Sequence, residues 1–184
     1  MLIEILKNLI TFETTSTNFN EINKAFDYIK NKIKDLKIYS KTFYFNKHPM
    51  LLISTKNNKR FDLLLASHID VVPASYDLFK PKIIKNKLIG RGSYDMKFAI
   101  ACYIQLLKDL KNKLKNLNLG ILITSDEEIG GFNGTMKFLK LGYKANICFL
   151  PDGGDNWKFE KAAKGVWHLK IKSFGKSGHG SRPW

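Results

Sequence analysis

The stretch Leu63-Leu-Leu-Ala-Ser-His-Ile-Asp70 is an apolar run that ends at a histidine, with an aspartate two residues later. Short apolar runs of this kind are typical of strands buried inside a sheet. In an open α/β sheet, ligands bind beyond the carboxyl ends of the strands. The sequence therefore predicts that His68 and Asp70 lie at a functional edge of a sheet, with His68 as a metal ligand.

The composition is that of a globular domain. The chain has 184 residues, 44% of them hydrophobic, which is enough for one domain with a substantial core. It has no long uncharged apolar run and no recognisable signal peptide, so we expect a cytoplasmic protein without a membrane-spanning helix. Its two cysteines, Cys102 and Cys148, lie in apolar segments, which predicts two buried thiols in a reducing compartment and no metal role.

The net charge of +15 invites a nucleic-acid function, but its distribution argues against one. The basic residues are nearly all lysines spread along the chain, alongside many asparagines and isoleucines. Nucleic-acid sites use clustered arginine and lysine with stacking aromatics or a known motif. We therefore expect a small-molecule partner, and neither nucleic acid nor a membrane.

Strands and helices alternate along the chain. Helices are expected over residues 2–11, 20–36 and 96–115 and from Gly131 to about 141, and strands over 37–46, 50–55, 61–67, 82–89, 118–125 and 145–150. This alternation predicts an α/β fold with a mostly parallel sheet and helices on both faces. A further alternating strand is expected over residues 166–174, before a glycine-rich loop that contains His179.

Carboxylates follow the other expected elements. Glu127 and Glu128 come directly after one strand, Asp152 follows the next, and Asp95 precedes a helix. In a doubly wound sheet these loops share one edge. One imidazole with several carboxylates is a ligand set for Zn²⁺, or for Mn²⁺ or Co²⁺ in its place. Because clustered carboxylates repel each other unless a cation neutralises them, the pattern favours a site with two bridged metals.

Each of these residues also has an ordinary structural explanation when taken alone. A histidine after a strand is usually a satisfied structural residue. Adjacent glutamates at the start of a helix favourably meet its dipole. Asp95 is a good helix cap, and an aspartate before two glycines is common in turns. Only the joint pattern favours a metal site over these alternatives.

The sequence resembles the zinc-dependent aminoacylase/carboxypeptidase family, which includes carboxypeptidase G-type enzymes, acetylornithine deacetylase, succinyl-diaminopimelate desuccinylase and peptidase T. The matching motifs are Ser67-His-Ile-Asp-Val-Val-Pro73, Gly90-Arg-Gly-Ser-Tyr-Asp-Met-Lys97, Thr124-Ser-Asp-Glu-Glu-Ile-Gly-Gly131, Pro151-Asp152 and Gly175-Lys-Ser-Gly-His-Gly-Ser-Arg-Pro183. Their order and spacing are those of the family from residue 63 onward. The resemblance implies a zinc-exopeptidase-like catalytic domain and a homodimer for the full-length relative.

The resemblance also implies a role for each residue. His68 and Asp152 would bind the first of two Zn²⁺ ions, and Asp95 would bridge both, with a cis Asp95–Met96 peptide. Glu128 would bind the second metal. Asp70 would orient the His68 ring. Glu127 would be the general base that takes a proton from the attacking water and passes it to the leaving amine.

Two departures from the family pattern concern the C-terminal part. Relatives carry a second histidine ligand well past residue 184, and His179 is not that residue. By resemblance, His179 belongs to an inserted lid domain, where it stabilises the oxyanion, often across a dimer interface. We therefore expect residues 1–161 to be the N-terminal part of the catalytic domain and residues 162–184 to be the start of a truncated lid.

These observations predict a dinuclear metal-dependent hydrolase that cleaves a peptide or N-acyl amide bond. Asp152 tilts the expectation toward a peptidase, because desuccinylase-like branches usually have glutamate there. The chain is interpreted as part of a longer protein, and by itself is expected to hydrolyse weakly or not at all. The alternative is an inactive relative that acts as a binding module.

Overall fold

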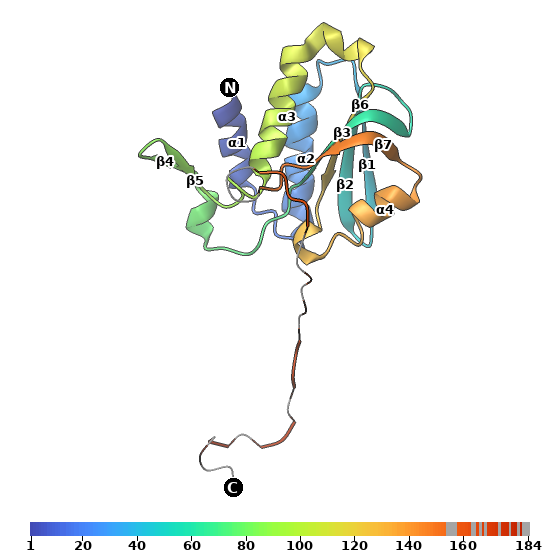
Figure 1. The fold of residues 1–184 in the computed structure, drawn as a ribbon. Helices are drawn as coiled ribbons and strands as arrows, with labels where there is room; N and C mark the ends of the chain where they lie inside the picture. Colours follow the sequence, from blue (N-terminus) through green and yellow to red (C-terminus); the bar gives the residue numbers. More distant parts are fainter. Residues whose placement is uncertain are drawn as a thin grey trace.

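The computed structural model describes residues 1–153, 158–162, 165, 167, 169–172, 174–176, 178–179 and 181. Its centre is a sheet of five strands in the order β1-β2-β6-β3-β7 (Figure 1). The strands are β1 Tyr39–Phe45, β2 His48–Ser54, β3 Arg60–His68, β6 Leu119–Thr124 and β7 Lys144–Phe149. This arrangement confirms the expected α/β class.

The sheet is mixed, with a parallel half that carries the candidate site. β3 pairs in parallel with both β6 and β7, whereas β2 is antiparallel to β6 and to β1. Asn46 and Lys47 have positive φ angles of 47° and 71° and form the tight turn of the β1–β2 hairpin. Because β6, β3 and β7 run in the same direction, their carboxyl ends meet at one edge.

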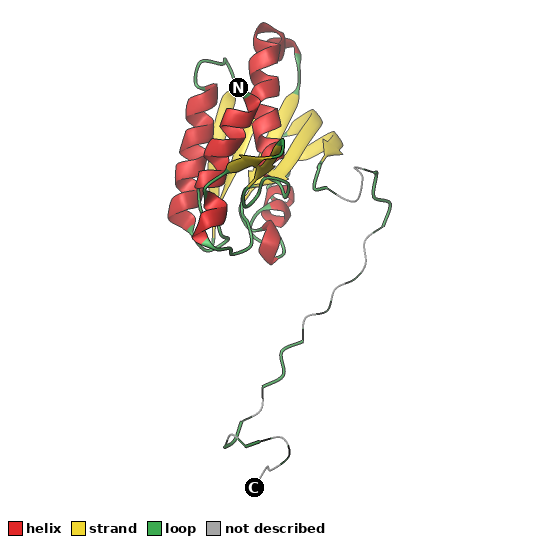
Figure 2. Cartoon of the chain, turned by 90° about the vertical axis from the view of Figure 1, so that its left-hand side faces the viewer, coloured by secondary structure: helices red, strands yellow, loops and turns green. Residues whose placement is uncertain are grey.

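Helices cover both faces of the sheet, as expected. The helices α1 Leu2–Thr11, α2 Phe19–Ile33 and α3 Lys97–Leu110 lie on one face, and Figure 2 shows them side by side there. The short helix α4 Thr135–Lys140 packs against the other face through Phe138, which joins a core with Phe61 and Tyr143. The larger core lies under α1–α3, where residues such as Leu9, Phe26 and Ile100 are fully or almost fully buried.

A two-stranded ribbon lies apart from this sheet. β4 Lys82–Ile84 pairs with β5 Lys87–Ile89 in an antiparallel hairpin, and the two turn residues Lys85 and Asn86 have positive φ. No helix among the described residues is both long enough and apolar enough to cross a bilayer. The ribbon leads into Gly90 and the loop that carries Asp95.

The structure corrects the expected helices in two places. The helix expected over 96–115 ends at Leu110 and continues as a 3-10 helix from Lys111 to Asn116, with Lys111 at a φ of 38°. The helix expected directly after Gly131 is confined to α4, and the preceding Glu127–Ile129 form a 3-10 turn. Both differences arise at ends of elements, where periodicity of apolar residues carries little information.

The prediction of two buried thiols is wrong, because Cys102 and Cys148 are both exposed. Cys102 falls between the buried positions of α3, so it lies on the outer face of that helix. Cys148 lies on β7, an edge strand whose Ile147 and Phe149 are exposed as well. An apolar run therefore did not mean burial on either element.

The strand expected over residues 166–174 is not seen in its described part. Residues 167, 169–172 and 174 are exposed and in no strand, and residues 166, 168 and 173 lie outside the described residues. A β-strand requires a hydrogen-bonding neighbour, and the described chain offers none beside these residues. The division into a catalytic part and the start of a lid stays a prediction.

Candidate metal centre

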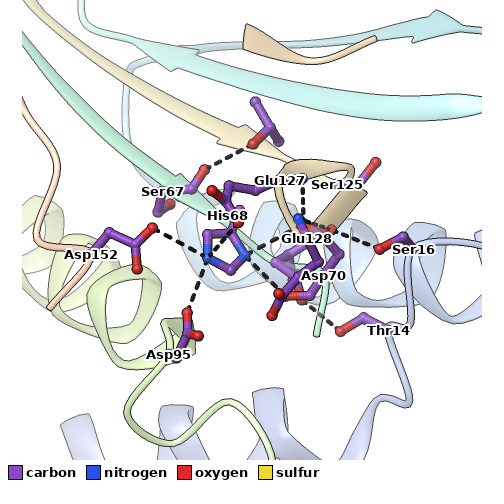
Figure 3. A network of polar contacts seen from close by, with 12 residues as sticks. Thr14, Ser16, Ser67, His68, Asp70, Asp95, Ser125, Glu127, Glu128 and Asp152 are labelled. Atoms are coloured by element: carbon purple, nitrogen blue, oxygen red, sulfur yellow. Dashed lines mark hydrogen bonds and ion pairs between the residues drawn. The ribbon is translucent and has the colours of Figure 1, made fainter. Parts of the chain in front are cut away.

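The candidate site lies beyond the carboxyl ends of β3, β6 and β7. His68 is the last residue of β3 and pairs with Thr124, so Glu127 and Glu128 follow β6 at the same level. Leu65 of β3 pairs with Phe149 of β7, which brings Asp152, three residues on, to the level of His68. Asp95 reaches the same place from the loop before α3 (Figure 3).

His68 faces different partners through its two ring nitrogens. Its Nε2 atom lies 3.1 Å from Asp95 Oδ1, 3.7 Å from Asp152 Oδ2 and 3.9 Å from Glu127 Oε2. Its Nδ1 atom lies 3.0 Å from the backbone oxygen of Asp70 and 3.4 Å from Asp70 Oδ1. A metal-binding histidine usually has its other nitrogen held in this way, which fixes the ring orientation.

Asp70 is fully buried and connects three segments of the chain. Its carboxylate accepts hydrogen bonds from Ser16 Oγ at 2.8 Å and from the backbone N–H groups of Glu127 and Glu128 at 3.2 and 3.1 Å. Thr14 Oγ1 donates to the neighbouring Ile69 oxygen at 2.6 Å. Asp70 therefore holds the His68 ring and the Glu127–Glu128 turn in one network, visible in Figure 3.

The pKa values of the site reflect crowded carboxylates around one imidazole. Burial alone would lower the pKa of His68, but Asp70, Glu127 and Asp152 outweigh it and raise the pKa to about 9. Burial and the neighbouring carboxylates raise the pKa values of Glu127, Glu128 and Asp152. Carboxylates that lie this close together repel each other when they are ionised, and a bound cation would neutralise that repulsion.

The donor atoms fit a divalent metal. One group of three ligand atoms comes from His68, Glu127 and Asp152, and a second comes from His68, Asp95 and Glu128; within each group all atoms lie within 4.8 Å of one another. Imidazole nitrogen with carboxylate oxygen suits Zn²⁺, Co²⁺ and Mn²⁺. The four predicted metal ligands and the predicted base Glu127 are thus gathered in one place, and the Asp95–Met96 peptide is cis.

Several residues that shape the site were not predicted from the sequence. Asp126 is buried, and its Oδ2 atom accepts a 2.6 Å hydrogen bond from Asn133 N, which closes the loop after Glu127 and Glu128. A Cβ atom on Gly134 would collide with Asp126 Oδ1, so glycine is required there. Ser16 and Thr14 lie more than 50 residues from Asp70 in sequence, and no local pattern indicates them.

Lys97 was also missed as a structural element. Its side chain is fully buried, and burial lowers its pKa to about 7. The buried position follows directly on the Asp95–Met96 peptide. The available signals were its place two residues after a predicted ligand and at the end of the Gly90–Lys97 motif.

His179 is not joined to the site by any contact of the described residues. It is exposed, and its Nδ1 atom lies 2.9 Å from Ser181 Oγ, two residues further on. Its expected role at the oxyanion therefore stays a prediction.

Strand-end ligands around one histidine define an α/β protein with a candidate divalent-metal site. Residues 64–176 match the sequence profile of Peptidase family M20/M25/M40, and the chain belongs to this family. This finding agrees with the resemblance that the motifs indicated.

Two kinds of relatives are similar to the chain. Succinyl-diaminopimelate desuccinylase of Orientia tsutsugamushi (strain Ikeda) is 32% identical over 203 residues, covering 100% of this chain and 51% of the relative. Acetylornithine deacetylase of Buchnera aphidicola subsp. Acyrthosiphon pisum (strain Tuc7) is 30% identical, covering 98% and 50%. The chain thus spans about half the length of these curated relatives.

Solved structures share the fold. Human carnosine dipeptidase 1 superposes with a TM-score of 0.70 at 15% identity and covers 83% of this chain and 38% of its own. An M20 family metallo-carboxypeptidase from Sulfolobus solfataricus gives a TM-score of 0.65 at 20% identity, covering 84% and 37%. At these identities the likeness concerns the fold alone.

Proposed function

We propose that the chain is the metal-binding part of a dinuclear hydrolase that cleaves a peptide or N-acyl amide bond in a small substrate. One observation carries the proposal: His68 belongs to two groups of three potential metal ligands. The carboxylates around this buried imidazole come from separate loops, and a bound cation would relieve the repulsion between them. Family membership supports a hydrolytic use of this arrangement.

The proposed roles are those that the family resemblance implies. His68 and Asp152 would hold the first metal, Glu128 the second, and Asp95 would bridge the two. Asp70 would fix the tautomer and orientation of His68 through its contacts with Nδ1. When bound, the metals would polarise the amide carbonyl and activate a water molecule.

Glu127 is the proposed general base. Its side chain is about half exposed, so it can meet a substrate, whereas Asp70 is buried and engaged. Its raised pKa, caused first by burial, makes it a better proton acceptor than an ordinary glutamate. Glu127 would take a proton from the attacking water and deliver it to the departing amine nitrogen.

The substrate class is proposed from two indications that differ. The curated relatives described above are a desuccinylase and a deacetylase, which favours an N-acyl amino acid. Asp152, by the resemblance, favours a peptide. A panel that contains a dipeptide, an N-acetyl and an N-succinyl amino acid therefore covers the proposal.

The test combines metal binding with hydrolysis. The purified chain is titrated with Zn²⁺ and Co²⁺ by calorimetry and then assayed on the panel, beside Glu127→Gln, Asp95→Asn and the exposed control Glu4→Gln. We expect binding by the wild type, Glu127→Gln and Glu4→Gln, and weakened binding by Asp95→Asn. Any hydrolysis should be lost in Glu127→Gln alone among these three binding-competent proteins.

Two results would overturn the proposal. The first is that the wild-type chain binds neither metal at neutral pH. The second is hydrolysis by Glu127→Gln at the wild-type rate, which would remove Glu127 from the reaction.

A binding role is the second candidate, favoured by exposed apolar side chains around β7 and α4. Ile147, Phe149 and Leu139 are 64%, 47% and 62% exposed. Leu139 lines a cavity of about 350 Å³ that also reaches His68 and Glu127, whereas Ile147 and Phe149 are not among its lining residues. Exposed apolar surface marks association sites when it gathers into a patch. A folded monomer that binds no metal, seen by gel filtration and calorimetry, would favour this candidate.

A further inference from the structure

Lys97 connects the loop of Asp95 to a distant part of the chain. It begins α3, two residues after Asp95, and its side chain has no exposed surface. Its Nζ atom donates hydrogen bonds to the Leu9 oxygen at 3.0 Å and to the Phe12 oxygen at 2.8 Å, both at the end of α1. The last carbonyls of a helix lack partners within the helix, so Lys97 satisfies groups that α1 cannot.

The Lys97 side chain is held along its whole length. A Cβ atom on Gly92 would lie 2.8 Å from Lys97 Cδ and 3.0 Å from Val71 Cγ1, so the three residues pack closely. Gly92 has a φ of 81°, and its oxygen accepts the Lys97 backbone N–H at 2.9 Å. The ring of Phe79 lies 6.0 Å from Nζ. The Asp95 loop therefore cannot shift without moving this packed side chain.

The residues after α1 continue the connection to Asp70. Thr14 donates its hydroxyl to the Ile69 oxygen and accepts the Val71 N–H at its own backbone oxygen, at 2.6 and 3.0 Å. Ser16 donates to the Asp70 carboxylate. Lys97 is thus hydrogen-bonded to Phe12, and the segment that continues from Phe12 to Ser16 is hydrogen-bonded to Asp70, which contacts His68.

We propose that Lys97 is a positioning residue that sets Asp95 at the correct distance from His68, an inference that rests on the proposed metal site. The Lys97 amine donates to backbone oxygens of the α1 end, and so acts by joining the loop of Asp95 to the segment that holds Asp70. Both the charged and the neutral amine carry at least two N–H groups, so both contacts are available in either protonation state. A metal site tolerates errors of only about 0.5 Å in the positions of its donor atoms, so a residue that fixes the loop of Asp95 matters for binding.

The test compares metal affinity with stability. Lys97→Met keeps the apolar stem and removes the donors, and Lys97→Gln keeps an amide NH₂ group on a shorter stem. Zn²⁺ affinity is measured by competition with a chelating dye, the Co²⁺ absorption spectrum is recorded, and urea unfolding of the metal-free proteins is followed by circular dichroism. Lys108→Met, near the other end of α3, is the control for the chemical change.

A second control separates positioning from general loosening of α1. Ile5 is buried on α1 and does not contact the Lys97 amine through any hydrogen bond. Ile5→Val removes one buried methyl group, which weakens the packing of α1, and leaves the Lys97 hydrogen bonds in place. Its metal affinity and Co²⁺ spectrum should equal those of the wild type.

We expect Lys97→Met to bind Zn²⁺ about 10-fold more weakly or worse, with an altered Co²⁺ spectrum, and Lys97→Gln to lie between it and the wild type. Wild-type affinity in a folded Lys97→Met, or in Lys97→Gln if Lys97→Met does not fold, would overturn the proposal. If both variants stay unfolded in saturating Zn²⁺, Lys97 is a structural residue and the proposal is also wrong. Failure of the wild type itself to bind metal would instead remove the proposed function.

Discussion

Asp70→Asn tests how the site is held together, because it removes a charge and keeps the shape. The Asp70 carboxylate is fully buried and accepts hydrogen bonds from Ser16 Oγ and from two backbone N–H groups. An asparagine amide accepts at its oxygen only, so its NH₂ group must face at least one of these donors. The ion pair with His68 Nδ1, at 3.4 Å, disappears as well.

The expected loss of stability is about 3 kcal/mol at neutral pH in the metal-free protein. A buried donor without a partner costs about 1–3 kcal/mol, and removing one partner of a buried ion pair costs about 3–5 kcal/mol. The Glu127 and Glu128 amides are not deeply buried, so we neglect the first cost and take the lower end of the second range. The His68 pKa should fall too: burial already lowers it, and Asp70 is the first of the groups that raise it.

The assay is urea unfolding of the metal-free chain, together with an NMR titration of the His68 ring. Asp62→Asn makes the same chemical change at an exposed position of the same strand, and should cost no more than about 0.5 kcal/mol. A loss below about 1 kcal/mol in Asp70→Asn, or an unchanged His68 pKa, would refute the view that Asp70 organises the site.

Three further predictions concern titration, thiols and association. The His68 pKa is raised above its ordinary 6.5 to about 9, so the charged ring stabilises the metal-free fold below pH 6.5 and this contribution is lost as the pH rises to 9. The difference in the free energy of unfolding between wild type and His68→Gln should therefore shrink by about 3 kcal/mol over that window, and unfolding experiments at both pH values measure it. The lowered pKa of Lys97 changes stability with pH in the opposite sense, but this contribution is the same in both proteins and cancels in the difference. Cys102 and Cys148 should both react with a thiol reagent in the folded protein. Partial burial raises both pKa values, so the reactive thiolate forms at higher pH and the reaction should become faster as the pH rises. Two unreactive thiols would contradict the observed exposure. Ile147→Lys on β7 should reduce self-association in sedimentation experiments, whereas Ile3→Lys at an exposed position of α1 should not. Equal effects of the two substitutions would show that the β7 surface has no special part in association.

Much of the fold was predictable because periodic patterns report on burial. The run before His68 indicated a strand, and the helical spacing from Ile22 to Ile33 indicated α2. The rule that parallel strands share a functional edge then brought His68, Glu127 and Asp152 together without any distance being known. The position of each residue along the chain was sufficient for this prediction, because residues that directly follow neighbouring parallel strands must lie at the same edge of the sheet.

The residues that hold the ligands were not predictable in the same way. Ser16 and Asp70 are 54 residues apart, and Lys97 and Leu9 are 88 apart. Ser16 reaches the Asp70 carboxylate, and Lys97 reaches the backbone oxygen of Leu9, only in the packed fold, and serine and lysine occur at many exposed positions. The prediction that Cys148 is buried failed for a related reason: an apolar sequence on an edge strand does not reveal whether another element covers it.

This contrast reflects the structure of the site itself. Three of the four proposed ligands, His68, Glu128 and Asp152, follow strand ends, so their approximate meeting is a property of the sheet. The distances of 3.1 to 3.9 Å around His68 Nε2 require a finer adjustment than a sheet provides. That adjustment comes from Asp70, which joins the His68 ring to the Glu127–Glu128 amides, and from the α1 end that Lys97 ties to the Asp95 loop. Loss of the Asp70 contacts should therefore disturb both proposed metal positions at once, because Asp70 contacts the ring of His68, proposed for the first metal, and the backbone N–H of Glu128, proposed for the second.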